Sequence, residues 1–172
     1  MGRTLSTSQR GFSVVELLVA LAVAGILVGV GIPAFNGFVD QQRLTTYTND
    51  MISGLAYARS EAVKLGGVVS LVAAAPAADN EWGGGYCVAV GVPADCTGTV
   101  LRRFDAAVAA TVNAVDGLNN VGAISFNARG LLVGGVGGDV QVCSTDASVT
   151  AGRTVNVSVI GRTDAEDLVC GP

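Results

Sequence analysis

The sequence predicts an α+β fold, in which one long N-terminal helix packs on a β-rich domain. Three observations support it. The segment Leu17–Phe35 contains no charged or strongly polar side chain. The following segment repeats apolar residues at helical spacing as far as Gly66, and beyond Val68 the apolar period changes to two. The expected parts are a leader (1–11), an apolar helical half (12–39), an amphipathic helical half (40–66) and a β-rich domain (67–172).

The apolar segment Leu17–Phe35 is long enough to cross a membrane, because a spanning helix needs about 20 apolar residues. A short polar leader with Arg3 and Arg10 precedes it. An ordinary secretory signal is cut after its apolar region, at a small-x-small site. Here a plausible cleavage site lies ahead of that region, between Gly11 and Phe12. We therefore expect the apolar segment to remain in the mature protein as a transmembrane anchor.

This N-terminal stretch resembles the class III signal of type IV pilins and pseudopilins. That signal has a short basic leader, a Gly, a Phe and a Glu four residues after the Phe, and Gly11, Phe12 and Glu16 match it. The resemblance implies cleavage after Gly11 by a prepilin peptidase and N-methylation of Phe12. The alternative is a plain signal anchor in which Glu16 occurs by chance.

Glu16 is the one predicted site with a physical mechanism for assembly. A carboxylate in an apolar helix costs about 2.5–3.5 kcal/mol at mid-bilayer, and less near the interface. Cleavage would give Phe12 a free amine, and in a bundle of such helices Glu16 could pair with the amine of a neighbouring subunit. The alternative is that Glu16 snorkels to the lipid headgroups.

The second half of the predicted helix is amphipathic. One stripe combines residues at a spacing of seven with residues at intermediate positions: Leu44, Thr48, Met51, Leu55, Ala58, Ala62 and Leu65. Gly66 and Gly67 provide a C-terminal stop. We therefore expect one helix from about Ser13 to Leu65, with Pro33 as a point where it can kink.

Short segments with a period of two follow this helix and are predicted to be strands. They are Val68–Val72, Tyr86–Val90, Val100–Phe104, Ile124–Phe126, Val140–Val142 and Thr154–Ile160. The last alternates most cleanly, with Val155, Val157 and Val159 on one face. The amphipathic half of the helix is the expected cover for the apolar face of these strands.

Composition argues against several functions. The chain has no histidine, which excludes Ser-His-Asp and Cys-His catalysis. The run Gly134–Gly138 lacks the Lys-Ser/Thr pair of a phosphate loop. We expect no enzymatic activity and no cofactor. The net charge of −4 becomes more negative when Arg3 and Arg10 leave with the leader, so nucleic acid is disfavoured as a partner.

The chain has four cysteines: Cys87, Cys96, Cys143 and Cys170. None of them forms a C-x-x-C pair, which argues against zinc binding and thioredoxin-like chemistry. An even count in an exported domain favours disulfides, and three pairings are possible. We favour Cys87–Cys96 and Cys143–Cys170. The basic leader should stay in the cytoplasm by the positive-inside rule. In a diderm bacterium the β-rich domain would then lie in the oxidising periplasm.

A second resemblance covers nearly the whole chain beyond the signal. Its stretches are LAYARSEAVKLG at Leu55–Gly66, Trp82 with Gly85–Tyr86, ISFNARG at Ile124–Gly130 and RTVNVSVIGR at Arg153–Arg162. They resemble the FimT/FimU–GspH family of type IV minor pilins and pseudopilins. The resemblance implies a pilin-like, GspH-type fold, with the long N-terminal helix packed on an antiparallel β-sandwich. It implies other minor and major pilins, the prepilin peptidase and inner-membrane lipid as partners.

Two polar features near the C-terminus have weaker functional interpretations. Asp164, Glu166 and Asp167 form an acidic cluster of the kind that can bind Ca²⁺, but a solvated turn is the favoured interpretation, and no metal site is predicted. In FimT-like proteins linked to DNA uptake, the stretch that matches Gly161-Arg-Thr-Asp tends to read Gly-Arg-x-Arg. Here Asp164 replaces the second basic residue, so Arg162 is only a weak candidate for DNA binding.

The leading functional hypothesis is a minor pilin of a type IV pilus, held in the bacterial inner membrane and built into the pilus at or near its tip. One alternative has the same fold but belongs to a different assembly: a GspH-like minor pseudopilin of type II secretion. The other is a DNA-binding minor pilin for natural transformation.

Overall fold

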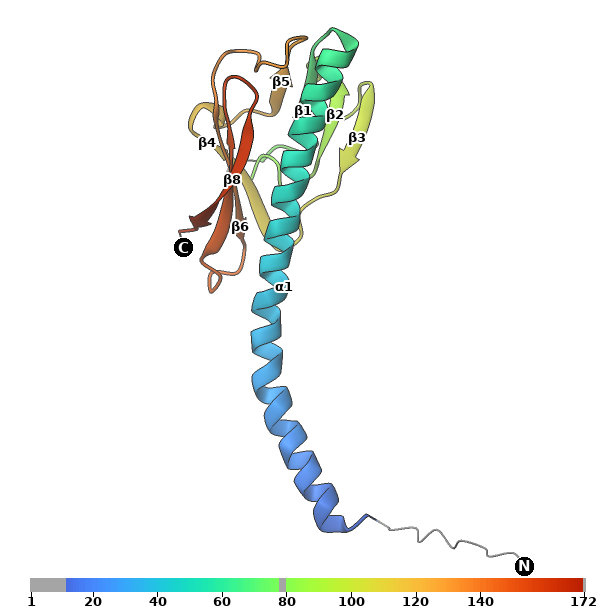
Figure 1. Ribbon diagram of the computed structural model, residues 1–172, viewed down its shortest axis with the longest axis vertical. Coiled ribbons are helices and arrows are strands. Elements are labelled where there is room, and N and C mark those ends of the chain that lie inside the picture. Colours follow the sequence, from blue (N-terminus) through green and yellow to red (C-terminus); the bar gives the residue numbers. More distant parts are fainter. Residues whose placement is uncertain (1–11, 78–79, 172) are drawn as a thin grey trace, which may run out of the picture. The chain divides into compact units, whose positions relative to one another are not determined.

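The structure, a computed structural model, describes residues 12–77 and 80–171, apart from the side chains of residues 30–36. The predicted leader and Gly11 lie outside this description. The chain divides into two compact units between Phe38 and Val39. The first contains the N-terminal half of the helix α1 (Val14–Leu65), and the second contains the rest of α1 and all the strands (Figure 1).

In the described part of the chain, eight strands form two antiparallel sheets of four strands each. The first sheet has the order β3-β2-β1-β5 and the second the order β4-β6-β7-β8. The first is built from β1 (Val69–Ala73), β2 (Tyr86–Val90), β3 (Val100–Phe104) and β5 (Ala123–Phe126). The second is built from β4 (Ala110–Val115), β6 (Gly138–Ser144), β7 (Ala151–Val157) and β8 (Thr163–Val169), with a short 3₁₀ helix η1 (Asp116–Leu118) after β4.

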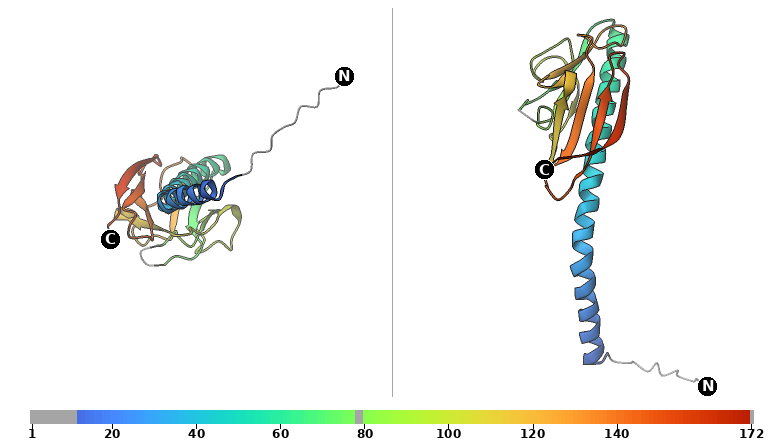
Figure 2. Two further views of the ribbon diagram at one scale, coloured as in Figure 1. Left: turned by 90° about the horizontal axis from the view of Figure 1, so that it is seen from below. Right: turned by 90° about the vertical axis from the view of Figure 1, so that its left-hand side faces the viewer.

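The C-terminal half of α1 packs on both sheets and shares one core with them. Figure 2 shows the strands of the second sheet, coloured yellow to red, running alongside this half of the helix. Its buried stripe is Leu44, Thr48, Met51, Leu55, Ala58 and Ala62, as the sequence predicts. Leu71 and Val88 enter this core from the first sheet, and Val140 and Val155 enter it from the second. The predicted fold, a long helix on antiparallel sheets, is therefore confirmed.

The prediction is wrong for one member of the stripe, Leu65, whose side chain is 52% exposed. The helix ends at this residue. Gly66 adopts a φ of 64°, and the amide of Gly67 donates to the carbonyl of Ala62 at 3.2 Å, which closes the last turn. Because the chain turns away immediately after Leu65, this side chain lies at the rim of the core.

The strand predictions need three corrections. The sequence predicts a strand over Thr154–Ile160, but β7 ends at Val157. Val159 and Ile160 lie in the turn that follows and are 45% and 61% exposed. Strand β4 has no counterpart among the predicted strands. Strand β8 replaces the solvated turn that was expected around the acidic cluster.

The free edge of β4 is covered by the segment before β2. The side chain of Asn80 accepts a hydrogen bond from the amide of Val112 at 2.7 Å, and the carboxylate of Glu81 accepts one from the amide of Ala114 at 3.1 Å. The amide of Trp82 donates to the carbonyl of Val112 at 3.0 Å. These contacts satisfy backbone groups that a sheet edge would otherwise leave open.

Candidate functional site

Ser13 and Glu16 form a reciprocal cap at the start of α1. The amide of Ser13 donates to Oε2 of Glu16 at 3.0 Å, and the amide of Glu16 donates to the hydroxyl of Ser13 at 3.2 Å. This pattern, Ser-x-x-Glu, is a capping box, which satisfies two amides that a helix start leaves without partners. The Ser-x-x-Glu spacing signals this capping role of Glu16, which is absent from the predictions made above from the sequence. Within the described residues, Oε1 of Glu16 has no hydrogen-bond partner.

The first unit presents large apolar side chains to its surroundings on every face. Their exposed fractions range from 51% at Val23 to 82% at Phe12. They are Phe12, Val14, Val15, Leu17, Leu18, Val19, Leu21, Val23, Ile26, Leu27 and Val28. Part of the expected anchor Leu17–Phe35 falls on residues 30–36, whose side chains lie outside the description. Among the described residues, no helix combines the length and the apolar character needed to cross a membrane.

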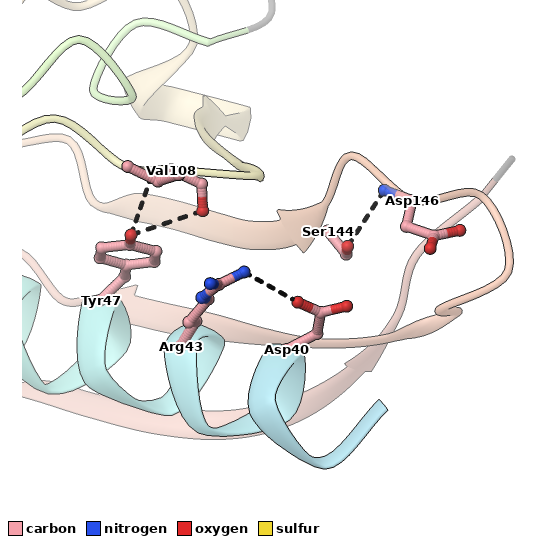
Figure 3. A network of polar contacts seen from close by, with 6 residues as sticks. All are labelled: Asp40, Arg43, Tyr47, Val108, Ser144 and Asp146. Carbon is pink, nitrogen blue, oxygen red and sulfur yellow. Dashed lines mark hydrogen bonds and ion pairs between the residues drawn. The ribbon is translucent and has the colours of Figure 1, made fainter. Parts of the chain in front are cut away.

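A polar network holds the segment before β4 on α1, at the start of the second unit (Figure 3). The hydroxyl of Tyr47 accepts a hydrogen bond from the amide of Val108 at 2.8 Å and lies 3.5 Å from its carbonyl oxygen. One turn earlier on the helix, Arg43 pairs with Asp40 at 3.2 Å. These bonds fix the position of the segment but bring together no pair of groups suited to catalysis.

Figure 3 also shows a polar contact at the loop after β6. The hydroxyl of Ser144 accepts a hydrogen bond from the amide of Asp146 at 3.1 Å. The carboxylate of Asp146 in turn accepts bonds from the hydroxyl and the amide of Ser148, at 2.7 and 2.9 Å. These bonds favour the charged form and hold the pKa of Asp146 below its usual value.

Two disulfides are present, and they follow the pairing favoured from the sequence. Cys87 is bonded to Cys96, and Cys143 to Cys170. The first bridge lies in a small buried cluster with Val72 and Ala89 on the outer face of the first sheet. The second joins β6 to the residue that follows β8, so it attaches the end of the last strand to the second sheet.

The acidic residues near the C-terminus do not converge on a metal site. Asp164, Glu166 and Asp167 lie along β8, where the alternation of a strand separates Asp167 from the other two. Asp167 pairs with Arg153 at 2.9 Å. Within the described residues, no group of three or more His, Cys, Asp or Glu side chains is placed to hold a metal ion.

The outer face of the second sheet is nevertheless strongly acidic around Asp139 on β6. Partial burial raises the pKa of the Asp139 carboxyl, and the carboxylates of Asp116, Glu166 and Asp164 raise it further. A carboxyl responds in this way where negative charges gather without enough cations between them.

Arg162 lies in the turn between β7 and β8 and pairs with Asp164 at 3.4 Å. It also lines a cavity of about 590 Å³, which we call the arginine pocket. The lining residues are Ala56, Arg59, Ser60, Val63, Arg129, Gly161, Arg162 and Thr163. Nothing in the sequence links Arg59 and Arg129 to Arg162, since these residues come together only through the fold.

Two family models match the chain. Residues 47–161 match the model described as type II transport protein GspH. Residues 6–32 match the prokaryotic N-terminal methylation motif. The first covers the amphipathic half of α1 and most of the strands, and the second covers Ser13, Glu16 and most of the apolar segment.

Among similar solved structures are two crystal forms of the type IV minor pilin FimU of Pseudomonas aeruginosa. One has 25% sequence identity and a TM-score of 0.61 over 75% of this chain and 92% of that one. The other has 25% identity and a TM-score of 0.58 over 71% of this chain and 91% of that one.

Similar curated sequences include the type IV major alpha-pilin and the fimbrial protein Q of Moraxella bovis. Each is 28% identical over 47 residues, which are 27% of this chain. The match spans 30% of the length of each of these proteins. Both the family and the fold are those of structural subunits and not of enzymes.

Proposed function

The chain belongs to the GspH family and is a type IV pilin-like minor subunit, and from this premise we propose that it is a minor pilin of a type IV pilus. In this proposal a prepilin peptidase cuts between Gly11 and Phe12, and Phe12 is N-methylated. The apolar half of α1 anchors the chain in the inner membrane until the subunit joins the pilus with other minor and major pilins. The position we propose is at or near the tip, where the subunit would help to start assembly.

The main support for this proposal is that the two halves of one helix differ in how their apolar side chains are covered. Leu44 and Leu55 are buried under the sheets, whereas Leu18 and Leu27 are 61% and 67% exposed. A water-exposed helix with such side chains on all faces would be unfavourable, at about 25 cal/mol for each Å² of apolar surface left in water. Lipid before assembly, and neighbouring helices after it, would remove this surface from water.

The cap at Ser13 suggests how Glu16 can serve both anchoring and assembly. Oε2 is used within the subunit, whereas Oε1 remains available to the N-terminal amine of a neighbouring Phe12. A carboxylate oxygen can accept more than one hydrogen bond, so the internal cap and the pairing between subunits need not compete. In lipid an unpaired carboxylate is costly, so pairing with an amine would favour the assembled state.

A pseudopilus of a type II secretion system is the second candidate, favoured by the description of the matching family model. The structural similarity to the pilus subunit FimU, which covers 92% of the FimU chain, favours a pilus over a pseudopilus. A deletion strain separates them. The proposal expects loss of twitching and of surface pili with unchanged protein secretion, restored by the wild-type gene. Loss of secretion with normal twitching would contradict it and favour the pseudopilus.

DNA binding for natural transformation is the third candidate, and the charges disfavour it. The turn that carries the weak sequence candidate, Arg162, is followed by Asp164 in place of a second basic residue, and the two side chains lie 3.4 Å apart. Arg102 and Arg103 lie apart from that turn, on β3 of the other sheet, and the net charge is −4. A gel-shift with the purified full chain in nonionic detergent tests this. Salt-sensitive retention of DNA that depends on Arg162 would revive the third candidate.

A further inference from the structure

The arginine pocket contains cationic groups that the proposed anchoring and processing do not use. Arg59 comes from α1, Arg129 from the turn after β5, and Arg162 from the turn between β7 and β8. The Nε–H of Arg59 donates to the carbonyl of Gly130 at 3.0 Å, which fixes the direction of its guanidinium group. A guanidinium group held in this way loses less conformational entropy on binding an anion.

Side-chain hydrogen bonds hold both turns that carry the other two arginines. Asn127 accepts bonds from the amides of Arg129 and Leu131, at 2.9 and 3.2 Å. The hydroxyl of Ser158 accepts a bond from the amide of Arg162 at 3.0 Å and donates to its carbonyl at 3.1 Å. Each arginine thus projects from a backbone segment with a defined conformation.

The two turns also contact each other through glycines. Gly130 and Gly161 both have φ of 73°, in the left-handed region that glycine adopts without strain. A Cβ atom on Gly161 would collide with the carbonyl oxygen of Gly130 and lie 3.1 Å from Nε of Arg59. The pocket therefore requires glycine at this position, because only a bare backbone lets the turns approach Arg59 so closely.

The pocket is positively charged in a chain whose net charge is −4. Across the described residues, Arg59 and Arg129 form no ion pair, and the Nε of Arg162 lies 3.4 Å from the nearest oxygen of Asp164. Guanidinium groups bind carboxylates and phosphates through paired, parallel hydrogen bonds. The chemistry of the pocket is thus that of an anion acceptor.

We propose that the arginine pocket binds carboxylate side chains from an acidic surface segment of a neighbouring subunit, an inference that rests on the proposed assembly into a pilus. Ala56 and Val63 supply apolar lining beside the arginines, and Val63 is 54% exposed. Arginine is enriched in protein–protein interfaces and among their hot spots. This chain itself presents a segment of that kind, since β8 carries three acids within 7 residues.

Nucleic acid fits the same pocket less well. Binding a single strand calls for a basic groove that follows several phosphates, together with aromatic side chains on which bases stack. No aromatic residue is among the described residues that line the pocket. Its volume of about 590 Å³ suits a few side chains better than a strand.

The test uses the full chain in nonionic detergent micelles and a blocked peptide as the probe. The peptide has the sequence of the 7 residues of β8, TDAEDLV, and a control peptide replaces its acids with Asn and Gln. The Nε–Hε signals of the arginine side chains are followed by NMR during titration. We expect saturable shifts at Arg59, Arg129 and Arg162 with the acidic peptide, an unshifted Arg102 signal, and no shifts with the amide peptide.

Variants of exposed arginines make the test specific. Arg129→Gln removes one charge without a side-chain hydrogen bond in the described structure, and it should weaken peptide binding about tenfold. Arg129→Lys should weaken it less, because the charge remains while the planar fork is lost. Arg102→Gln, a matched loss of charge on β3, should leave binding unchanged.

Three outcomes would overturn the proposal. They are the absence of saturable shifts, equal weakening by Arg102→Gln, and pocket-dependent binding of a single-stranded oligonucleotide without binding of the peptide. Because the titration does not involve the pilus, its result is independent of the proposed function. If the peptide binds as expected while the wild-type chain is absent from sheared pili, the minor-pilin proposal is contradicted, whereas the affinity of the pocket for acidic segments stands.

Discussion

Arg59 on the helix and Gly130 in the turn after β5 are joined by a hydrogen bond of 3.0 Å across 71 positions of the sequence. Gly130 is buried, and a Cβ there would meet Nε of Arg59 at 3.0 Å and Cγ2 of Val63 at 3.3 Å. The bond therefore fixes the turn on α1 and satisfies a carbonyl that the helix would otherwise cover.

Removing this bond should destabilise the second unit. Arg59→Gln leaves the carbonyl of Gly130 without its donor, so we expect the free energy of unfolding to fall by about 1–2 kcal/mol. Urea unfolding of the full chain in detergent, followed by the fluorescence of the buried Trp82, measures it. Arg129→Gln is the matched control and should change stability by less than about 0.5 kcal/mol. Equal effects of the two variants would show that the bond contributes nothing specific.

Leu55→Asp should unfold the second unit or detach its sheets from the helix. Leu55 has no exposed surface, and an unpaired buried carboxylate costs several kcal/mol against a typical total stability of about 5–15 kcal/mol. Ala56→Asp places the same charge on the exposed neighbour and should be tolerated. Circular dichroism melting of both variants checks this. An unchanged melting curve for Leu55→Asp would contradict the packing of α1 on the sheets.

The helix and its buried stripe could be predicted because their signal is local. Apolar residues at spacings of three, four and seven select one face of a helix whatever the strands do. From Leu44 to Ala62 that face is buried, and the period alone was sufficient. The exposed Leu65 shows where prediction from the period fails. The period indicates which face of the helix an apolar residue occupies, but it does not indicate whether another element extends far enough to cover that residue.

Strand β8 and the arginine pocket could not be predicted for a different reason. Strand β8 contains three acids in Thr163–Val169 and is an edge strand, so its stability comes from pairing with β7 and not from an apolar pattern of its own. Arg59, Arg129 and Arg162 lie far apart in sequence and meet only because two turns pack on one helix. No spacing rule connects them.

Alkylation should find no free thiol in the native, non-reduced protein and four thiols after reduction and denaturation. Replacing Cys143 and Cys170 by Ala should cost about 3 kcal/mol or more, because this bridge closes a loop of 27 residues. Mass spectrometry and urea unfolding measure the two effects. Four alkylatable thiols in the native protein would contradict both the bridges and an oxidising compartment.

Gly11→Val should block processing of the leader. In the proposed function a peptidase cuts directly after Gly11, and a branched side chain at that position would obstruct its active site. The mutant should keep residues 1–11 and migrate as the larger precursor in immunoblots of whole cells. Gly2→Val, within the same leader but away from the cut, is the control and should be processed normally. A mature mass for Gly11→Val would contradict the pilin-type signal.

The cap at Ser13 makes it possible to separate two roles of Glu16. Glu16→Ala removes both the capping oxygen and the charge, and it makes the helix more apolar, so insertion should be as good or better. Glu16→Gln keeps an oxygen that can accept from the amide of Ser13, as Gln does in capping boxes, but loses the charge. Ser13→Ala removes the hydroxyl of the cap and keeps the charge.

If the charge of Glu16 pairs with the amine of a neighbouring Phe12, Glu16→Gln should fail in assembly about as severely as Glu16→Ala. Both variants should be cleaved and should accumulate in the membrane, with a reduced share in sheared pili. We expect a reduction and not complete loss, because contacts of the second unit remain. Ser13→Ala should lose only the cap, about 1 kcal/mol of helix stability, and assemble nearly normally. The measurement is the ratio of this subunit in sheared pili to that in membranes. A ratio for Glu16→Gln equal to that of the wild type, with Ser13→Ala impaired, would assign Glu16 to capping alone and remove the proposed pairing between subunits.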